Sequence, residues 1–177
     1  YFFYPAQYWA HKNHFNLLRA YQRLTKETDR SVHLVFTGAD QGNKAYIMRI
    51  IRDLQLQERV KVLGFVSNEE IWTLYKNSIA LVMPTFLGPT NMPLLEAQYL
   101  GTAIICSDLK GHREMLRDGA LFVHPARPDE WTTAMKKMLD SEFRHTLVDR
   151  STQVKEQSIF TINTAIKMLE KALQQIV

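Results

Sequence analysis

The fold of this chain is decided by Pro84-Thr85-Phe86-Leu87-Gly88-Pro89-Thr90-Asn91-Met92-Pro93-Leu94-Leu95-Glu96-Ala97, which lies between the apolar runs 79–83 and 103–106. We read it as a strand end, a loop and a helix start, with a further strand after the helix. Loop amides and the positive end of the helix suit phosphate groups. An ionised carboxylate at Glu96 can accept two hydrogen bonds from a ribose diol, because it only accepts. The alternative for Glu96 is a first-turn acid that complements the helix dipole.

The same alternation of short apolar runs and longer helical patterns extends along the whole chain. The clearest helix start is a capping box made by Ser67 and Glu70. Short, nearly continuous apolar strands separated by helices indicate a parallel sheet covered on both faces. We therefore predict an α/β fold, a Rossmann-like three-layer α/β/α arrangement with about six parallel strands, in a single domain spanning 1–177. Strands are expected at 1–4, 33–36, 60–63, 79–83, 103–106 and 121–123, and helices at 13–26, 44–54, 67–77, 93–100, 112–116, 129–139, 142–157 and 161–176.

Composition narrows the class of protein. With 177 residues, of which 46% are hydrophobic and 23% charged, the chain has the composition of a globular domain. Its net charge of +4 is modest and no run of like charges is long, so we expect no nucleic-acid partner.

The only cysteine, Cys106, excludes a disulfide within the chain and is expected to be a small buried hydrophobe. Histidine spacing predicts no metal site. No apolar stretch approaches the ~20 residues of a membrane-spanning helix, and no signal peptide is recognised.

Ligands of parallel sheets bind beyond the carboxyl ends of the strands, which directs attention to loops 5–12, 38–43, 64–67 and 85–92. In the first loop, Lys12 can neutralise a diphosphate and stabilise it as a leaving group. Its alternative is a solvated surface lysine, although a first helical turn favours acids. Backbone at Phe65 and Val66 can read the edge of a nucleobase, or these residues only pack the turn. Thr90 or Asn91 is the natural N-cap of the following helix.

Two other classes of site fit poorly. A dinucleotide-binding dehydrogenase needs Gly-x-Gly-x-x-Gly in the first strand-to-helix turn, and no glycine occurs between Tyr1 and Thr37. An epimerase or hydrolase needs a base or nucleophile in the loops. Only His11 and His112 lie near them, and both are expected to be polar surface residues.

Several short motifs, in their order and spacing, match one known family. The chain resembles the C-terminal, donor-binding half of retaining GT-B glycosyltransferases of the group-1 (family-4) class. The chain begins at Tyr1 without a methionine, so we expect a fragment of a longer protein. The matching pieces are Lys12-Asn13-His14, Val62-Leu63-Gly64-Phe65-Val66-Ser67, Glu69-Glu70, Leu74-Tyr75, Pro84-Thr85, Pro93-Leu94-Leu95-Glu96-Ala97, Gly101, Ser107-Asp108, Gly111, Glu114, and Phe160 before an amphipathic helix.

The resemblance implies that Lys12 and Glu96 are the catalytic pair. Lys12 would bind the donor diphosphate, and Glu96, the second acid of a Glu-x7-Glu motif, would hold the ribose. Backbone around Phe65 and Val66 would meet the base, and loop amides around Thr90 and Asn91 the distal phosphate and sugar. The family needs no metal or other cofactor, and it transfers sugar on one face of the ring.

Two positions depart from the family pattern. Gly88 stands where the first acid of the motif belongs, and the neutral Gln7 stands where a basic residue is usual. Either the amides at 88–91 and the Asn91 side chain substitute, or the enzyme is slow or inactive. The alternative function is therefore a degenerate, non-catalytic scaffold or interaction domain.

The implied activity is transfer of a hexose from a nucleotide diphosphate sugar in surface polysaccharide synthesis. The implied partners are the nucleotide-sugar donor, an absent N-terminal acceptor-binding domain, and an acceptor glycan or lipid-linked glycan. The expected location is the cytoplasm, with the inner face of the membrane reached through the absent domain. We expect the fragment alone to bind a donor without transferring its sugar.

Overall fold

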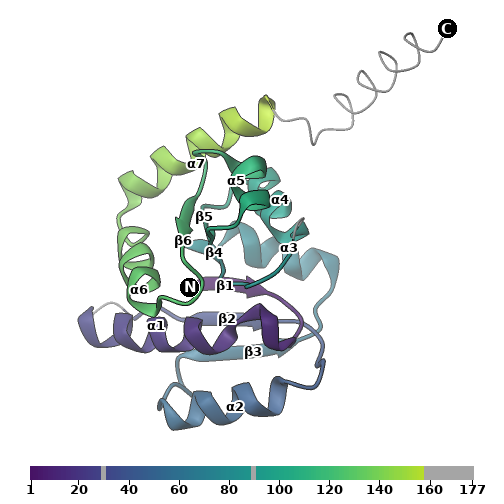
Figure 1. Ribbon diagram of the computed structural model, residues 1–177, viewed down its shortest axis with the longest axis vertical. Helices are drawn as coiled ribbons and strands as arrows, with labels where there is room; N and C mark the ends of the chain where they lie inside the picture. The colour runs from purple at the N-terminus through teal and green to yellow at the C-terminus, as the bar shows by residue number, and fades with distance from the viewer. Residues whose placement is uncertain (29–30, 89–90, 158–177) are drawn as a thin grey trace, which may run out of the picture.

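Six parallel strands form one sheet in the computed structural model, which describes residues 1–28, 31–88 and 91–157 (Figure 1). The strand order is β3-β2-β1-β4-β5-β6. Each strand lies within one residue of its predicted position, and the predicted Rossmann-like α/β class is confirmed. The strands are β1 (Phe2–Pro5), β2 (Leu34–Thr37), β3 (Val60–Gly64), β4 (Ala80–Met83), β5 (Ile104–Ser107) and β6 (Leu121–Val123).

The direction in which the sheet grows reverses between β1 and β4, which are paired through Phe2 with Ala80 and Phe3 with Leu81. Strands β2 and β3 are added on one side of β1, and β5 and β6 on the far side of β4. In such sheets the loops after the two strands at the reversal diverge and leave a crevice. The loops that contain Lys12 and Asn91 follow these two strands.

Helices cover both faces of the sheet. Helix α1 packs against α2 and α6, whereas α4 and α5 pack against α7, and Figure 1 shows α1 and α6 side by side. The predicted helix at 161–176 lies outside the described residues. The sequence did not predict the 3-10 turn η1 (Ala10–Lys12). The helices are α1 (His14–Glu27), α2 (Lys44–Asp53), α3 (Asn68–Lys76), α4 (Met92–Tyr99), α5 (Lys110–Leu116), α6 (Pro128–Lys137) and α7 (Ser141–Glu156).

The capping box of α3 is confirmed. The Glu70 amide donates to Ser67 Oγ at 3.3 Å, and the Ser67 amide donates to Glu70 Oε2 at 2.7 Å. Two amides that have no partner within the helix are thereby satisfied. Cys106 is also as predicted, since it is fully buried in the sheet.

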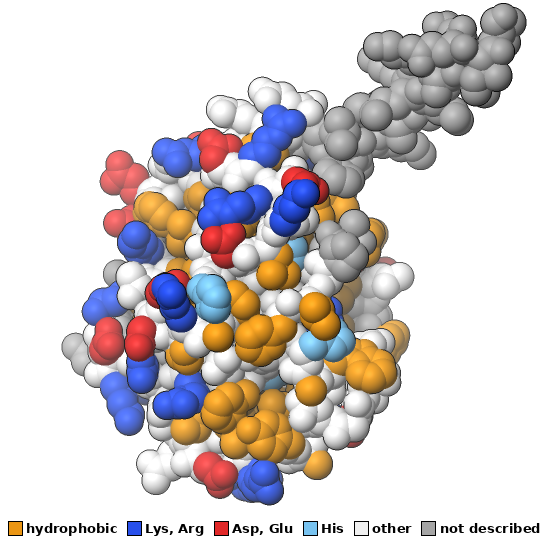
Figure 2. Space-filling model, in the orientation of Figure 1, with side chains coloured by type: hydrophobic (Ala, Val, Ile, Leu, Met, Phe, Trp, Pro, Cys, Tyr) orange, Lys and Arg blue, Asp and Glu red, His pale blue; other side chains and the backbone are white. Residues whose placement is uncertain are grey.

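Positively and negatively charged side chains are mixed on the face of the molecule drawn in Figure 2. On the face drawn in Figure 2, Lys and Arg are interspersed with Asp and Glu and form no continuous basic patch. None of the helices in the described ranges is long and apolar enough to cross a bilayer.

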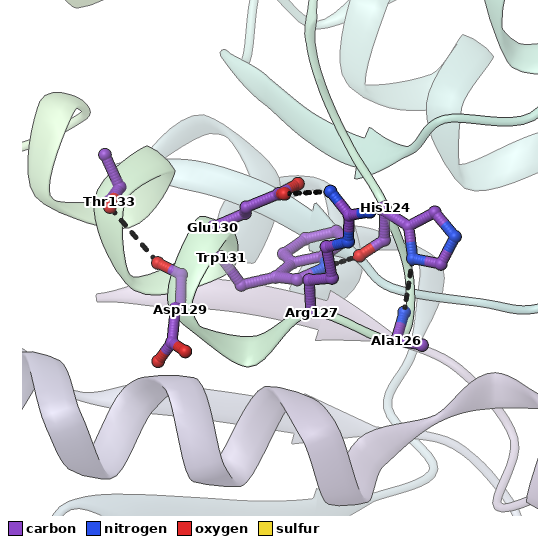
Figure 3. Close-up of polar contacts among 7 residues, drawn as sticks. All are labelled: His124, Ala126, Arg127, Asp129, Glu130, Trp131 and Thr133. Atoms are coloured by element: carbon purple, nitrogen blue, oxygen red, sulfur yellow. Dashed lines mark hydrogen bonds and ion pairs between the residues drawn. The ribbon is translucent and has the colours of Figure 1, made fainter.

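The turn between β6 and α6 is held by local hydrogen bonds (Figure 3). The indole Nε1 of Trp131 donates to the carbonyl of His124 at 3.1 Å, and the amide of Ala126 donates to His124 Nδ1 at 3.3 Å. Arg127 and Glu130 form an ion pair at 2.7 Å on the first turn of α6. These contacts fix the backbone on both sides of Pro125, whose carbonyl is used by the site described below.

His14, at the start of α1, lies in an aromatic cluster. Its ring stacks on Tyr8 with centroids 4.8 Å apart, and it also contacts the rings of Tyr4 and Phe36. Neither ring nitrogen has a hydrogen-bond partner among the described residues. Burial, followed by the nearby charge of Lys12, lowers the pKa of His14 to about 3. The imidazole is therefore neutral at physiological pH.

Replacing His14 with Phe should flatten the pH dependence of stability. The pKa of His14 lies below its ordinary 6.5 in the folded chain, so the unfolded chain takes up this proton first as the pH falls. Protonation of His14 therefore leaves the free energy of unfolding unchanged above pH 6.5. It lowers this free energy as the pH falls toward 3, by at most about 1.4 kcal/mol per pH unit. Urea unfolding at several pH values should show H14F gaining on the wild type as the pH falls. The exposed His145, changed to Asn, is the control. Parallel curves for H14F and wild type would contradict the assignment.

Candidate functional site

Lys12 and Asn91 meet at the reversal of the sheet. The Lys12 ammonium Nζ donates to Asn91 Oδ1 at 3.2 Å, joining the loop after β1 to the loop after β4. The ammonium is half-buried, and burial lowers its pKa. This excludes the alternative of a freely solvated lysine. No acid pairs with Lys12 in the described part of the chain, so its charge is not neutralised there.

The backbone that carries Lys12 is held on two sides. The buried Tyr4 hydroxyl donates to the Lys12 carbonyl at 2.7 Å. The carbonyl of His11 accepts from the Phe86 amide at 2.8 Å and from Thr85 Oγ1 at 3.2 Å. The two loops are therefore tied through their backbones as well as through the Lys12–Asn91 contact.

Asn13 determines where the η1 turn stops and α1 begins. Its backbone is left-handed, with φ 61°, a conformation that asparagine adopts more readily than most residues. Its side-chain Nδ2 donates to the carbonyls of Pro84 and Pro125, both at 2.8 Å. The sequence placed Asn13 in a family motif but assigned it no function. Its preference for left-handed backbone was the available signal.

Replacing Asn13 should separate its two contributions. Asn13→Ala loses both buried hydrogen bonds and strains the left-handed backbone, which together cost about 2–5 kcal/mol of unfolding free energy. Asn13→Gly loses the same hydrogen bonds but tolerates the backbone, so it should be about 1 kcal/mol more stable than Asn13→Ala. Urea unfolding of the three proteins measures both differences. If Asn13→Ala unfolds like the wild type, the side chain does not fix the loops.

Glu96 lies in the second turn of α4, whose first turn contains no acid. This removes the alternative of a first-turn acid on the helix dipole. The buried Tyr75 hydroxyl, at the end of α3, donates to Glu96 Oε2 at 2.7 Å. Burial, and then the Glu96 carboxylate, raises the pKa of Tyr75, so the phenol remains a donor. The second oxygen, Oε1, has no hydrogen bond or ion pair within the ranges the structure describes.

Asn91 occupies the predicted N-cap position of α4, but its side chain does not cap the helix. Its Nδ2 instead donates to the Gly88 carbonyl at 3.0 Å and lies 2.6 Å from His112 Nε2. The amides of the first turn of α4 therefore receive no side-chain cap from Asn91. Thr90, the other predicted N-cap and ligand residue, lies outside the described residues.

His112 corrects a prediction. We expected a polar surface residue, but the side chain is fully buried on α5. The reason is a pair of buried partners, Asn91 and the carbonyl of Ser107, which satisfy both ring nitrogens. His11, the other histidine expected at the surface, is partly exposed and stacks on Trp9.

Gly88, expected at the position of an acid, lies directly against Asn91. Its φ is +139°, and a Cβ built on it would clash with the side-chain amide of Asn91. The Asn91 amide thus fills the space that a side chain at 88 would enter.

A shallow cavity of about 270 Å³ lies at the ends of β1, β2 and β3 and brings together three predicted ligand residues, Gln7, Phe65 and Val66. Phe65 is 89% exposed, which argues against the alternative that it only packs the turn. Gln7 is neutral as noted, and its Oε1 accepts from the indole of Trp9 at 2.9 Å. The remaining lining residues are Pro5, Ala6, Thr37, Gly38, Ala39, Gly64 and Ile71.

The structure offers no evident metal site in its described ranges, where no three His, Cys, Asp or Glu side chains are grouped suitably. The expectation that no metal is needed remains a prediction.

Comparison with known proteins identifies the family. Residues 1–157 match the family described as "Glycosyl transferases group 1". The chain belongs to this family.

Curated relatives of this chain include bacterial and archaeal glycosyltransferases. The chain is 29% identical over 138 residues to the O-antigen chain mannosyltransferase RfbU of Salmonella typhimurium, covering 78% of the chain and 38% of the relative. It is 28% identical over 114 residues to the O-antigen chain mannosyltransferase B of Escherichia coli, covering 64% and 30%. The chain thus spans roughly a third of the length of these relatives.

Solved structures share the fold. A glycosyltransferase from Rickettsia africae superposes with a TM-score of 0.86 at 16% identity, over 99% of this chain and 47% of that one. Anabaena Alr3699/HepE in complex with UDP superposes with a TM-score of 0.85 at 18% identity, over 98% and 48%. The chain therefore has the fold of about half of each of these two structures.

A side chain at position 88 should displace Asn91 rather than replace a missing acid. Gly88→Ala places a Cβ against the Asn91 amide and strains a left-handed backbone. Gly42→Ala is the matched control, because Gly42 also has a positive φ but nothing lies within 4 Å of its added Cβ. We expect Gly42→Ala to lose about 1 kcal/mol of unfolding free energy and Gly88→Ala about 1–3 kcal/mol more. Equal losses would show that Asn91 does not depend on the glycine.

Proposed function

We propose that this chain is the donor-binding domain of a retaining glycosyltransferase. It transfers a hexose from a nucleotide diphosphate sugar to a glycan or lipid-linked glycan acceptor, in surface polysaccharide synthesis. The acceptor binds to an N-terminal domain outside this chain. The reaction takes place in the cytoplasm, with the inner face of the membrane reached through that domain. It uses no metal.

The single observation that carries the proposal is the Lys12 ammonium at the reversal of the sheet. It forms no ion pair within the described residues, and it donates to Asn91 at the start of α4. An anion placed there meets a cation and the positive end of a helix. When the bond between sugar and diphosphate breaks, negative charge grows on the diphosphate. A fixed cation in a site with little water then stabilises the departing group more than the bound donor. The departing phosphate also helps to activate the acceptor.

Glu96 supports the same proposal. Tyr75 holds one carboxylate oxygen and leaves the other without a partner among the described residues. A ribose diol presents two donors, and Oε1 can accept from them without breaking the Tyr75 contact.

The cavity beside Gln7, Phe65 and Val66 suits a nucleobase. The exposed ring of Phe65 offers an apolar surface on which a base can stack. Backbone amides around Thr90 and Asn91, together with Gly88, would lie nearest the distal phosphate and the sugar.

The relatives direct the choice of donor and acceptor. The two named above are mannosyltransferases of the O-antigen chain, which makes mannose the first sugar to test. A Campylobacter jejuni relative, 31% identical over 134 residues, is named for transfer to a diphospho-undecaprenol acceptor. This supports a lipid-linked acceptor.

A degenerate, non-catalytic domain is the second candidate. Gly88 and Gln7 favour it, since one lacks a side chain and the other lacks a charge where the family pattern has an acid and a base. The two candidates differ in whether the longer protein transfers sugar at all.

Isothermal titration calorimetry with UDP, GDP, UDP-glucose and GDP-mannose tests donor binding by this chain. We expect at least one ligand to bind below millimolar concentration. Lys12→Ala and Glu96→Ala should each weaken binding about tenfold or more, because each removes a contact to a charged or polar donor group. Lys76→Ala and Glu58→Gln, both exposed, are the matched controls. No binding of any of the four ligands at millimolar concentration would count heavily against the proposal.

The same substitutions in the longer protein distinguish the two candidates. Transfer that falls more than tenfold (about 1.4 kcal/mol) in Lys12→Ala and Glu96→Ala supports the assigned site. Transfer that neither change reduces by tenfold shows that the site is wrong. Binding without transfer to any acceptor favours the degenerate domain.

A further inference from the structure

A buried histidine lies behind the Lys12–Asn91 contact. A chain of hydrogen bonds runs from the Ser107 carbonyl to His112 Nδ1 at 2.8 Å, from His112 Nε2 to Asn91 Nδ2 at 2.6 Å, and from Asn91 Oδ1 to Lys12 Nζ at 3.2 Å. It connects the end of β5 to the ammonium. No family motif used above includes His112.

Hydrogen-bond chemistry fixes the proton on the imidazole. A backbone carbonyl only accepts, so His112 Nδ1 must carry the hydrogen that bonds to Ser107. Burial, opposed by the Ser107 hydrogen bond and reinforced by Lys12, lowers the pKa of His112. The ring is therefore neutral, and its Nε2 carries a lone pair.

The lone pair in turn fixes the Asn91 amide. Two acceptors, His112 Nε2 and the Gly88 carbonyl, lie beside the same end of the amide. That end must be the NH₂ group, which has two hydrogens to donate. Its oxygen then faces Lys12. In the opposite orientation the amide oxygen would face two acceptors, and the NH₂ group would face the ammonium.

We propose that His112 is a positioning residue, which holds the Asn91 amide with its oxygen toward Lys12 and so sets the place of the ammonium that meets the donor diphosphate. The inference rests on the proposed function for its consequence in donor binding. His112 itself is fully buried behind Asn91 and does not contact the ligand. The competing explanation is that His112 only anchors α5 to the end of β5 through Ser107.

Two substitutions separate positioning from anchoring. In His112→Asn the shorter amide can still donate to the Ser107 carbonyl, near the position of Nδ1, but it does not reach Asn91. In His112→Gln the longer side chain can place an oxygen near the position of Nε2, where it accepts from Asn91. The first keeps the anchor, and the second keeps the positioning contact. His145→Asn, at an exposed position of α7, is the control.

The direct measurement is NMR of the ligand-free chain. The ¹⁵N shifts of His112 should report a neutral ring with the proton on Nδ1. The side-chain resonances of Lys12 should move in His112→Asn and stay close to the wild type in His112→Gln. A proton on Nε2, or Lys12 resonances unchanged in His112→Asn, would overturn the inference whether or not a nucleotide binds.

Calorimetry with UDP and GDP measures the consequence. We expect His112→Asn to weaken binding about tenfold and His112→Gln to restore most of the affinity. A smaller loss in His112→Asn than in His112→Gln, in step with their melting temperatures, would favour the anchoring explanation and refute positioning. Equal losses in both variants would also refute positioning. A wild-type chain that binds neither nucleotide would count heavily against the proposed function, while the NMR result would still decide whether His112 positions Lys12.

Discussion

The site depends on the side-chain amide of Asn13. Its Nδ2 donates to two carbonyls, that of Pro84 beyond β4 and that of Pro125 beyond β6, while its own backbone turns left-handed after Lys12. Three loops that are far apart in sequence are thereby joined at one buried group. A buried carbonyl without a donor costs about 1–3 kcal/mol. Separating the loops would therefore be unfavourable by at least this free energy. This arrangement also fixes the backbone of Lys12, because Lys12 immediately precedes Asn13.

Both candidate charges are held by neutral partners. Lys12 is bonded to an amide and Glu96 to a phenol, and neither forms an ion pair within the described ranges. An opposite charge beside either group would reduce its field at a ligand. A neutral hydrogen-bonding partner fixes the group in place and leaves most of that field available. Half-buried charges without counter-charges are unfavourable for stability, and this pattern is typical of sites that bind charged ligands.

The starts of two helices show the same contrast between stability and binding. Helix α3 begins with a complete capping box, which satisfies its first amides with its own side chains. Helix α4 begins at Asn91, a residue able to cap it, yet the side chain is turned toward Lys12, Gly88 and His112. The helix gives up a local stabilisation worth about 1 kcal/mol. As a result, the amino-terminal end of α4 receives no side-chain cap from Asn91. The Asn91 side chain instead links the loop residues to one another.

The sequence by itself determined the strands, the α-helices of the described residues, the parallel α/β class and the loops that form the candidate site. These follow from local patterns such as apolar runs, the Ser67–Glu70 capping box and Lys12 at a helix start. It also marked Gly88 and Gln7 as departures from the family pattern. Only the tertiary structure decided how the loops meet. The burial of His112, the sideways turn of Asn91 and the contact of Tyr75 with Glu96, 21 residues apart, depend on which strands are neighbours. Local propensity carries no information about that order, and a polar residue looks the same in a sequence whether water or a buried partner satisfies it.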